Sequence, residues 1–320
     1  MRNFQAFPWA QTAKFFALAA VAASGGLALA QPRGNFLVEE TGRSFGRLDD
    51  AVKSIAEGSG TITVAPGRYP DCAVFAGATL TIRAAQPSTA IFDGGACEGK
   101  ATLVLRGADA AVDGLVFRGI KVPDHNGAGI RLEKGNLTVT RATFVDSEQG
   151  ILTGDDPSGS ISIERTTFAG LGGCPDGMCS HSIYIGAYGS LSISRVRFER
   201  GTGGHYAKSR AARVAITDSS FDDSRGHDTN YAIDLPNGAT GRIAGNVFVM
   251  GKSKENHSAI IAVAAERREN PSAGLIIERN DASIAPGAGY STTFVANWSH
   301  EPLKMGSNKI GAGIKLSDSR

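Results

Sequence analysis

Residues that could transfer protons recur at equivalent places in the middle of the chain. Tyr184, Lys208 and Asp234 each follow an apolar residue in a short segment of strand-like composition. Successive side chains of a strand point to opposite faces, so these three would share an outward face if the preceding apolar residues point inward. A phenol, an ammonium and a carboxylate on one face could carry out acid–base chemistry. The full outward column reads Arg131, Leu152, Tyr184, Lys208, Asp234 and Ile261.

The segment 205–210 departs most from a packing pattern. It places Lys208 and Arg210 on one strand, with alanine and serine where large aliphatic residues would fill a core. Such a break in pattern indicates function, and we place Tyr206 and Arg210 on the outward face with Lys208. His181 and His205 occupy equivalent positions at the starts of two of these strands; strict alternation turns both inward, but alternation often fails at a corner. The expected catalytic residues are Lys208, Arg210, Tyr184, His181, His205 and Asp234, and the expected substrate-binding residues are Arg131, Tyr206, Tyr231 and His257.

Each of these residues also has an ordinary structural interpretation. Lys208 and Asp234 could form a surface ion pair worth about 0–1 kcal/mol. Tyr184 could cover apolar surface, and a histidine at a corner could bind a backbone carbonyl. It is the conjunction of cations, phenol, carboxylate and histidines that favours a functional site.

A repeat of 23 to 30 residues brings these segments into register. Each copy alternates apolar and polar residues, makes a tight break and then places a phenylalanine. A repeat of this length with short β-branched runs predicts the coils of a β-solenoid, in which equivalent positions lie about 4.8 Å apart. Asn246, Asn280 and Asn308 fall at the corners, where asparagine tolerates left-handed geometry and forms local hydrogen bonds. The repeated phenylalanines are Phe117, Phe144, Phe168, Phe198, Phe221 and Phe248.

The start of this region adds a helix and a strand. Residues 45–56 have helical spacing with Ser44 as a potential N-cap, and residues 61–64 alternate as a strand before a turn. A short helix here would cover the open end of the solenoid. The order resembles the start of right-handed parallel β-helix proteins of the pectin-lyase-like superfamily. The resemblance implies an all-β fold, a right-handed parallel β-helix with a short N-terminal capping helix. That superfamily contains lyases, hydrolases, epimerases and phage or adhesin proteins with no shared catalytic motif, so it implies no single activity.

The first thirty residues have the features of a signal peptide. Arg2 and Lys14 precede the apolar run 15–23, and Ala28-Leu29-Ala30 has the small-x-small pattern of a cleavage site. We therefore expect a signal peptide at 1–30, an N-terminal segment with the capping helix at 31–58 and one β-helix domain at 59–320. The protein would be periplasmic or secreted, without a membrane span after cleavage; a retained anchor is the alternative.

Charge and cysteines support an exported protein of this kind. The formal net charge of +2 falls to 0 without Arg2 and Lys14, which argues against non-specific nucleic-acid binding. The four cysteines follow the leader, as expected in an oxidising compartment. Their spacing fits bridges between Cys72 and Cys97, about one coil apart, and between Cys174 and Cys179, around a small loop. A zinc site is the alternative, although neither pair has metal-finger spacing.

The chemistry that fits these residues is β-elimination on a polysaccharide that contains uronic acids. That reaction needs a cation for the carboxylate, a base for the C5 proton and an acid for the leaving oxygen. Lys208 would be the base or the carboxylate-neutralising cation, Arg210 its electrostatic partner, and Asp234 would orient Lys208. Tyr184 or a histidine would donate the proton. This resembles the basic-residue strategy of β-helix polysaccharide lyases and uronate epimerases.

Two other functions remain open at this point. Glycoside hydrolysis ordinarily uses two carboxylates, which Asp234 with Asp222 or Asp223 could supply. A non-catalytic envelope protein could instead bind glycan along the groove. We expect a monomer without a cofactor; Asp222, Asp223 and Asp228 could assist a Ca²⁺ site, but this is not our main expectation.

Overall fold

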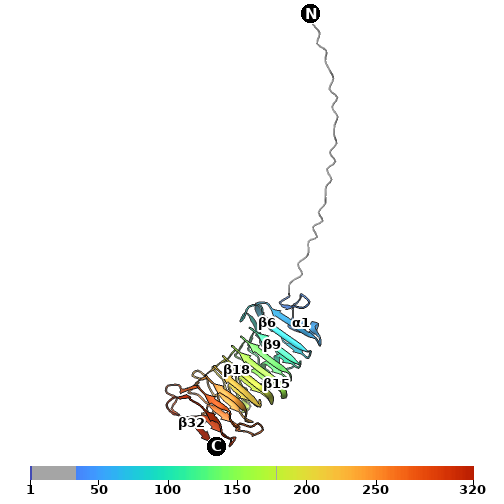
Figure 1. Cartoon of the computed structure of the whole chain (residues 1–320). Coiled ribbons are helices and arrows are strands. Elements are labelled where there is room, and N and C mark those ends of the chain that lie inside the picture. The colour runs from blue at the N-terminus through green and yellow to red at the C-terminus, as the bar shows by residue number, and fades with distance from the viewer. Residues whose placement is uncertain (2–33, 178) are drawn as a thin grey trace. The chain divides into compact units, whose positions relative to one another are not determined.

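Three long parallel sheets make up the part of the chain that the structure describes. A computed structural model describes residue 1 and residues 34–177 and 179–320; the expected signal peptide, apart from Met1, lies outside the described residues. The chain divides into Met1–Pro32 and Arg33–Arg320. In the second unit, strands follow one another from blue to red in a regular stack (Figure 1). Its strands connect as a right-handed parallel β-helix, which confirms the predicted fold class.

Each coil contributes one strand to each of three sheets, here called sheets A, B and C. Neighbouring strands are parallel except at the start of sheet A, where β1 pairs antiparallel with β2 and β3. Sheet A runs β2 (Arg43–Phe45), β1 (Phe36–Val38), β3 (Ser59–Val64), β6 (Thr79–Ala84), β9 (Asp109–Asp113), β12 (Asn136–Thr140), β15 (Asp156–Glu164), β18 (Tyr188–Ser194), β21 (Arg213–Thr217), β24 (Thr240–Ala244), β27 (Ile276–Glu278) and β30 (Lys304–Met305). Sheet B runs β4 (Gly67–Tyr69), β7 (Ala90–Asp93), β10 (Val116–Arg118), β13 (Thr143–Val145), β16 (Thr167–Ala169), β19 (Arg197–Glu199), β22 (Ser220–Asp222), β25 (Val247–Met250), β28 (Asp281–Ile284) and β31 (Lys309–Ile310). Sheet C runs β5 (Ala73–Phe75), β8 (Ala101–Leu105), β11 (Ala128–Leu132), β14 (Gln149–Thr153), β17 (Ile183–Ile185), β20 (Ala207–Ser209), β23 (Ile233–Leu235), β26 (Ile261–Val263), β29 (Thr292–Asn297) and β32 (Ile314–Ser319).

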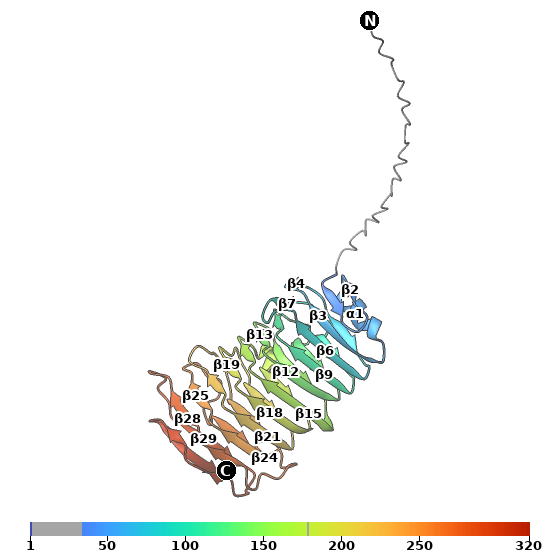
Figure 2. The same cartoon turned by 45° about the horizontal axis from the view of Figure 1, so that its top comes forward.

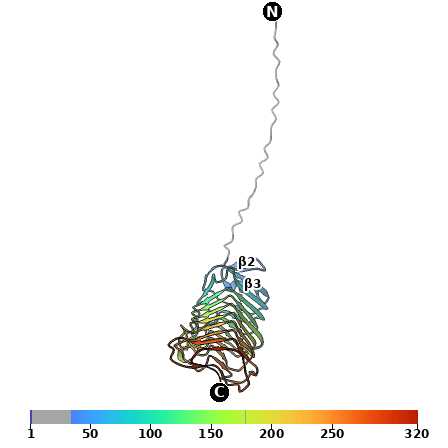
Figure 3. The ribbon, with the colours of Figure 1, turned by 60° about the vertical axis from the view of Figure 1, so that its left-hand side comes forward.

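A column of stacked phenylalanines fills the interior beside sheet B. The six repeated phenylalanines are fully buried, and neighbouring rings from Phe117 to Phe248 lie 4.8 to 5.0 Å apart between centroids. Each such pair adds about 0.5–1.5 kcal/mol beyond the burial of its area. The column therefore sets the coil-to-coil register that positions the outward residues of sheet C. The stack of coils is seen from other sides in Figures 2 and 3.

Asparagines at the corners form a second ladder. The Asn246 side-chain amide donates to Asn280 Oδ1 at 3.0 Å, and the Asn280 amide donates to Asn308 Oδ1 at 2.9 Å. The left-handed backbone at these corners belongs to the preceding residues, Gly245 and Arg279. None of the three asparagines has a positive φ, so left-handed geometry is not their role, whereas the expected local hydrogen bonding is present.

The helix that covers the N-terminal end is shorter than predicted. α1 spans Leu48–Ile55 and lies beside the first strands (Figure 2). It buries Leu48, Ala51 and Val52 against them. Ser44 is not its N-cap, because Ser44 pairs with Leu37 inside the β1–β2 hairpin. The N-cap position is Arg47, which forms no side-chain cap; instead the Leu48 backbone N–H donates to Asp71 Oδ1 at 3.1 Å.

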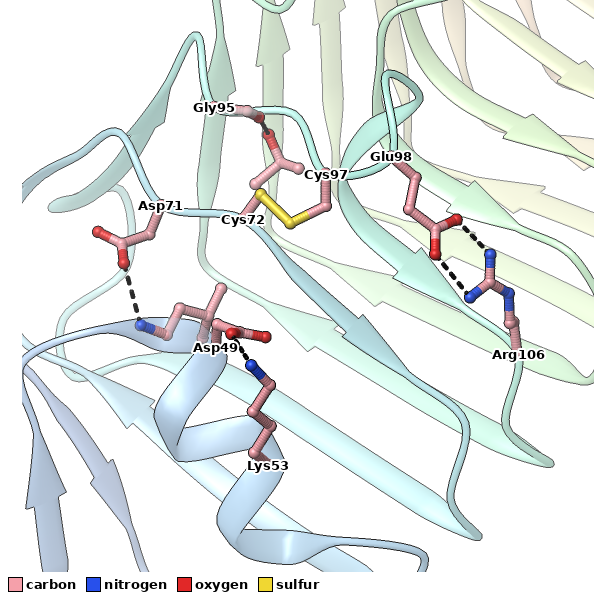
Figure 4. The surroundings of a disulfide bond; sticks show 10 residues. Asp49, Lys53, Asp71, Cys72, Gly95, Cys97, Glu98 and Arg106 are labelled. Atoms are coloured by element: carbon pink, nitrogen blue, oxygen red, sulfur yellow. Dashed lines mark hydrogen bonds and ion pairs between the residues drawn. A yellow bond between two sulfur atoms is a disulfide. The ribbon is translucent and has the colours of Figure 1, made fainter.

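Both expected disulfides are present. Cys72–Cys97 joins chain segments 25 residues apart, close to the Glu98–Arg106 ion pair (Figure 4). Cys174–Cys179 closes the small loop that contains the 3₁₀ turn Pro175–Gly177. Across the described residues, no helix is both long and apolar enough to cross a membrane.

Candidate functional site

A cleft of about 730 Å³ lies over the outward face of sheet C. Its lining includes Arg131, Leu152, Tyr184, Arg210 and Glu266. Leu152 packs with three buried residues of β8 and β11 and with Tyr184 into a small apolar cluster, separate from the interior core. The cleft thus combines an apolar floor with charged groups, an arrangement common in ligand sites.

The sheet C pairing brings the predicted outward residues onto successive coils. Arg131 pairs with Leu152, Leu152 with Tyr184, Tyr184 with Lys208, and Lys208 with Asp234.

The next rung differs from the prediction. Asp234 pairs with Ala262 rather than with Ile261, so the expected column slips by one residue at β26. The cause is local: the Ile260 carbonyl accepts from the N–H groups of both Ala232 and Ile233, at 2.9 and 3.2 Å. Because one carbonyl accepts from two successive N–H groups, the chain has one residue more than the repeat predicts before β26 begins.

Lys208 is held between two carboxylates. Its Nζ lies 2.6 Å from Glu266 Oε1 and 3.3 Å from Asp234 Oδ2, and its side chain is only 10 % exposed. Burial alone would lower the pKa of Lys208, but Asp234 and Glu266 together raise it above its ordinary value. Lys208 is therefore a cation at neutral pH, which argues against its predicted role as a base. The expected contact with Asp234 is present.

Arg210 links Glu266, one of these two carboxylates, to the phenol of Tyr184. Its Nε donates to Tyr184 Oη at 3.0 Å, its Nη2 donates to Glu266 Oε2 at 2.6 Å, and its Nη1 donates to Asn237 Oδ1. Lys208 Nζ and Arg210 Cζ lie 5.6 and 5.7 Å from the Tyr184 ring centroid. Two cations thus lie against the ring of one phenol that faces the cleft, within the range of cation–π contacts.

Asp234 is an almost fully buried carboxylate. Its side chain is 3 % exposed, and Oδ1 has no hydrogen-bond partner among the described residues. Burial raises the pKa of Asp234 to about 6, although the Lys208 cation acts in the opposite direction. A carboxylate with such a pKa can hold or release a proton near neutral pH.

The two histidines lie between Tyr184 and Asp234, not in the interior core. His205 Nε2 is 3.6 Å from Asp234 Oδ2, and the His181 ring meets the edge of Tyr184 at 5.3 Å between centroids. His181 Nδ1 accepts from the His205 backbone N–H at 3.0 Å and lies 3.1 Å from His205 Nδ1. His181 Nδ1 therefore carries no proton, because it accepts from that backbone N–H.

Both rings are neutral at neutral pH. Burial, helped by the Lys208 charge, lowers the pKa of His181 to about 3. Burial, then His181 and Lys208, lowers the pKa of His205 well below its ordinary value. Neither ring belongs to the cleft lining, so both support the site from beside it.

Tyr206 does not join the outward column. It is 2 % exposed, its ring packs against Phe198, and its hydroxyl donates to Asp223 Oδ1 at 2.6 Å. Its position before β20 begins frees it from strict alternation, and the side chain turns toward the adjoining loops. The predicted outward position of Tyr206 is therefore wrong.

Two other predicted binding residues are also absent from the cleft lining. The Tyr231 ring lies 5.4 Å from His205 and its hydroxyl lies 3.5 Å from Ser258 Oγ, so it backs the histidine pair. His257 is exposed and stacks on Tyr290 at 4.7 Å between centroids. Of the predicted binding residues, Arg131 is the one that lines the cleft.

Asp223 belongs to a separate buried cluster. Its Oδ2 accepts from Lys254 Nζ at 3.0 Å and from Thr229 Oγ1 at 2.8 Å, besides the Tyr206 bond to Oδ1. These donors satisfy Asp223, which is thus not available as the partner of Asp234 or as a Ca²⁺ ligand. Among the residues described, no group of three or more histidine, cysteine, aspartate or glutamate side chains could hold a metal ion.

Sequence reasoning missed Glu266 and Asn237. Glu266 lies beyond the end of β26, after the left-handed Ala264, and reaches back to Lys208 and Arg210, more than fifty residues earlier. Asn237 follows β23 and orients Arg210. Neither residue falls on a strand position of the repeat. The sequence signal for Glu266 was the charged run 266–269, which follows shortly after a sheet C strand.

Comparison with known proteins identifies the fold. No protein-family model matches the chain, and no curated protein matches its sequence. Among solved structures, an alginate lyase from Paenibacillus sp. str. FPU-7 aligns with a TM-score of 0.57 at 15% identity, over 85% of this chain and 94% of that one. This likeness shows the fold, a parallel β-helix.

Two pectin methylesterase structures in complex with hexasaccharides are also similar, at lower scores. One aligns with a TM-score of 0.35 and 11% identity, over 86% of this chain and 78% of that one. The other aligns with a TM-score of 0.31 and 12% identity, over 81% and 68%. At these identities the likeness concerns the fold and not individual residues.

Proposed function

We propose that this protein is an exported enzyme that cleaves an acidic, uronate-containing polysaccharide by β-elimination in the cleft over sheet C. The observation that carries the proposal is the arrangement of two cations, Lys208 and Arg210, around the phenol of Tyr184 at the cleft wall. This arrangement supplies the charge that an elimination on a uronate needs. The structural likeness to a polysaccharide-degrading enzyme agrees with a carbohydrate substrate.

Arg210 is the cation that faces the substrate. It lines the cleft, whereas Lys208 is covered by Glu266 and Asp234. A guanidinium that binds the uronate carboxylate withdraws negative charge from it and so makes the C5 proton easier to remove. Lys208 then acts as a fixed positive charge behind the phenol, and Asp234 and Glu266 hold it in place.

Tyr184 transfers the proton. As a phenolate held by the hydrogen bond from Arg210 Nε, the Tyr184 oxygen accepts the C5 proton. The electron pair of that C–H bond forms the C4–C5 double bond as the C4–O bond breaks. The same hydroxyl then returns the proton to the leaving oxygen, so one residue serves as base and acid on one face of the sugar.

Hydrolysis is the second candidate, on a specific observation. Asp234 and Glu266 both contact Lys208, and the pKa of Asp234 is about 6, which suits a general acid. The loop carboxylate of such a pair would be Glu266 and not Asp222 or Asp223. The burial of Asp234 favours elimination, because a general acid must reach the glycosidic oxygen.

The proposed location is the periplasm or the extracellular medium. Two disulfides fit an oxidising compartment, and residues 1–30 have the pattern of a signal peptide. Protein mass after expression with the full leader tests this, since cleavage after Ala30 predicts a mature chain that begins at Gln31.

The activity test is an assay of the mature protein on alginate, pectate, glucuronan and neutral glucan. We expect ultraviolet absorbance from an unsaturated product on at least one uronate polymer, lost in Tyr184→Phe and in Arg210→Gln. Arg267→Gln is the matched control, because Arg267 lines the same cleft but pairs with Glu269. New reducing ends without absorbance would support hydrolysis, and binding without either product would contradict an enzyme.

A further inference from the structure

One cation of the cleft has no partner. Arg131 is partly exposed on β11 and lines the cleft, yet its side chain takes part in no hydrogen bond or ion pair among the described residues. Its Nε is buried and unpaired. A buried donor without a partner costs free energy, so a side chain held in this way is a candidate ligand-binding group.

The carboxylate that follows Arg131 on the same face of its strand is already paired. Glu133, two residues further along, binds both Lys100 and Arg106, and Glu98 binds the same two cations. This closed set of two cations and two carboxylates does not include Arg131, which lines the cleft without a partner for its side chain among the described residues. Arg210, by comparison, has three protein partners.

We propose that Arg131 binds the carboxylate of a second uronate residue, at a subsite distant from the bond that is cleaved. This inference rests on the proposed function, because it concerns the same cleft and the same class of substrate. A guanidinium matches a carboxylate with two parallel hydrogen bonds. The ligand class is therefore a chain that carries a free carboxylate on more than one sugar.

The coil spacing gives the distance between the two carboxylate sites. Arg131 is two coils from Tyr184, with Leu152 between them, and two steps of about 4.8 Å give about 10 Å. One coil step is close to the length of one pyranose residue in an extended chain. A polymer that runs along the solenoid axis would thus place three successive sugars over Tyr184, Leu152 and Arg131.

Leu152 suits the sugar in the middle. It is almost fully buried within the outward apolar cluster that also includes Tyr184. The apolar face of a pyranose ring can pack there without leaving a polar group unpaired. The cleft floor therefore offers a charged, an apolar and a reactive position in consecutive coils.

The experiment measures kcat/KM on oligouronates of two to five residues for the wild type, Arg131→Gln and the control Arg242→Gln. Arg242 pairs with Glu278 on sheet A and is not among the residues that line the cleft. In the wild type we expect kcat/KM to rise when the oligomer becomes long enough to reach Arg131. Arg131→Gln should lose about tenfold to a hundredfold on the four-residue substrate, the range of a charge-assisted hydrogen bond. On the two-residue substrate Arg131→Gln should equal the wild type, and Arg242→Gln should equal the wild type at every length. An equal loss at every length, or no loss, would overturn the inference.

A binding measurement separates this inference from the proposed reaction. If the wild type yields no unsaturated product, titration calorimetry with a four-residue oligouronate and its methyl ester still tests Arg131. The inference holds if the wild type binds the free acid more tightly than the ester and Arg131→Gln removes most of that difference. It fails if Arg131→Gln binds both ligands as the wild type does.

Discussion

Replacing Asp234 with asparagine should make the protein more stable at neutral pH while it impairs the site. Burial raises the pKa of Asp234 from 3.8 to about 6. A carboxyl whose pKa is higher in the folded than in the unfolded protein adds to stability when it is protonated. This contribution is complete at pH values below the pKa of the unfolded state, and it is lost as the pH rises through the pKa of the folded state. At about 1.4 kcal/mol per pKa unit, the loss reaches about 3 kcal/mol by neutral pH. Asp234→Asn keeps the shape and removes this loss.

The assay is urea unfolding of the wild type and Asp234→Asn at several pH values between about 4 and 7, followed by far-ultraviolet circular dichroism. Circular dichroism reports on all three sheets, whereas Trp298, close to β29, reports on the last coils. The stability of Asp234→Asn relative to the wild type should increase with pH, up to about 3 kcal/mol near pH 7. Turnover should fall because Lys208 loses one of its two carboxylates. A stability difference that does not change with pH would refute the reasoning about Asp234.

Three further outcomes follow from other contacts. Tyr184→Phe should keep the urea midpoint of the wild type, because among the described residues the hydroxyl makes one hydrogen bond, to Arg210. Its turnover should fall by about a hundredfold or more. A Phe variant with wild-type turnover would exclude Tyr184 as the group that transfers the proton. His181→Gln should make the free energy of unfolding less sensitive to acid, as measured by urea unfolding. The pKa of His181 is lowered to about 3 in the folded protein. The wild type therefore loses about 1.4 kcal/mol of stability per pH unit from this group as the pH falls below 6.5. Joint replacement of Cys72 and Cys97 by alanine should cost about 3 kcal/mol, whereas replacing Cys174 and Cys179, which close a loop of only 5 residues, should cost less; equal urea midpoints for the two double variants would contradict this.

The repeat made the architecture predictable from sequence. Interior phenylalanines recur once per coil and identify each coil without knowledge of its loops. The outward column followed from the alternation of strand side chains, and it holds from Arg131 to Asp234. Its slip at Ile261 reflects an extra residue at a corner, where hydrogen bonding and not alternation sets the register.

The contacts around the site depend on corners and loops that do not follow the sequence repeat. Tyr206 turns inward from a corner to reach Asp223, and Glu266 reaches the site from an irregular loop. The raised pKa of Lys208 follows from Glu266 as well as Asp234, so a role for Lys208 as a base could not be excluded before that loop was placed. Ser44 had the right type for an N-cap, but pairing with Leu37 in a hairpin took precedence.

The most direct test of the central claim is cleavage of a uronate polymer in water enriched in heavy oxygen, with the products analysed by mass spectrometry. Elimination breaks the C4–O bond without adding water, so the account predicts unsaturated products that carry no solvent oxygen, formed by the wild type and not by Tyr184→Phe. Saturated products with one solvent oxygen at each new reducing end would contradict elimination and support hydrolysis through Asp234 and Glu266.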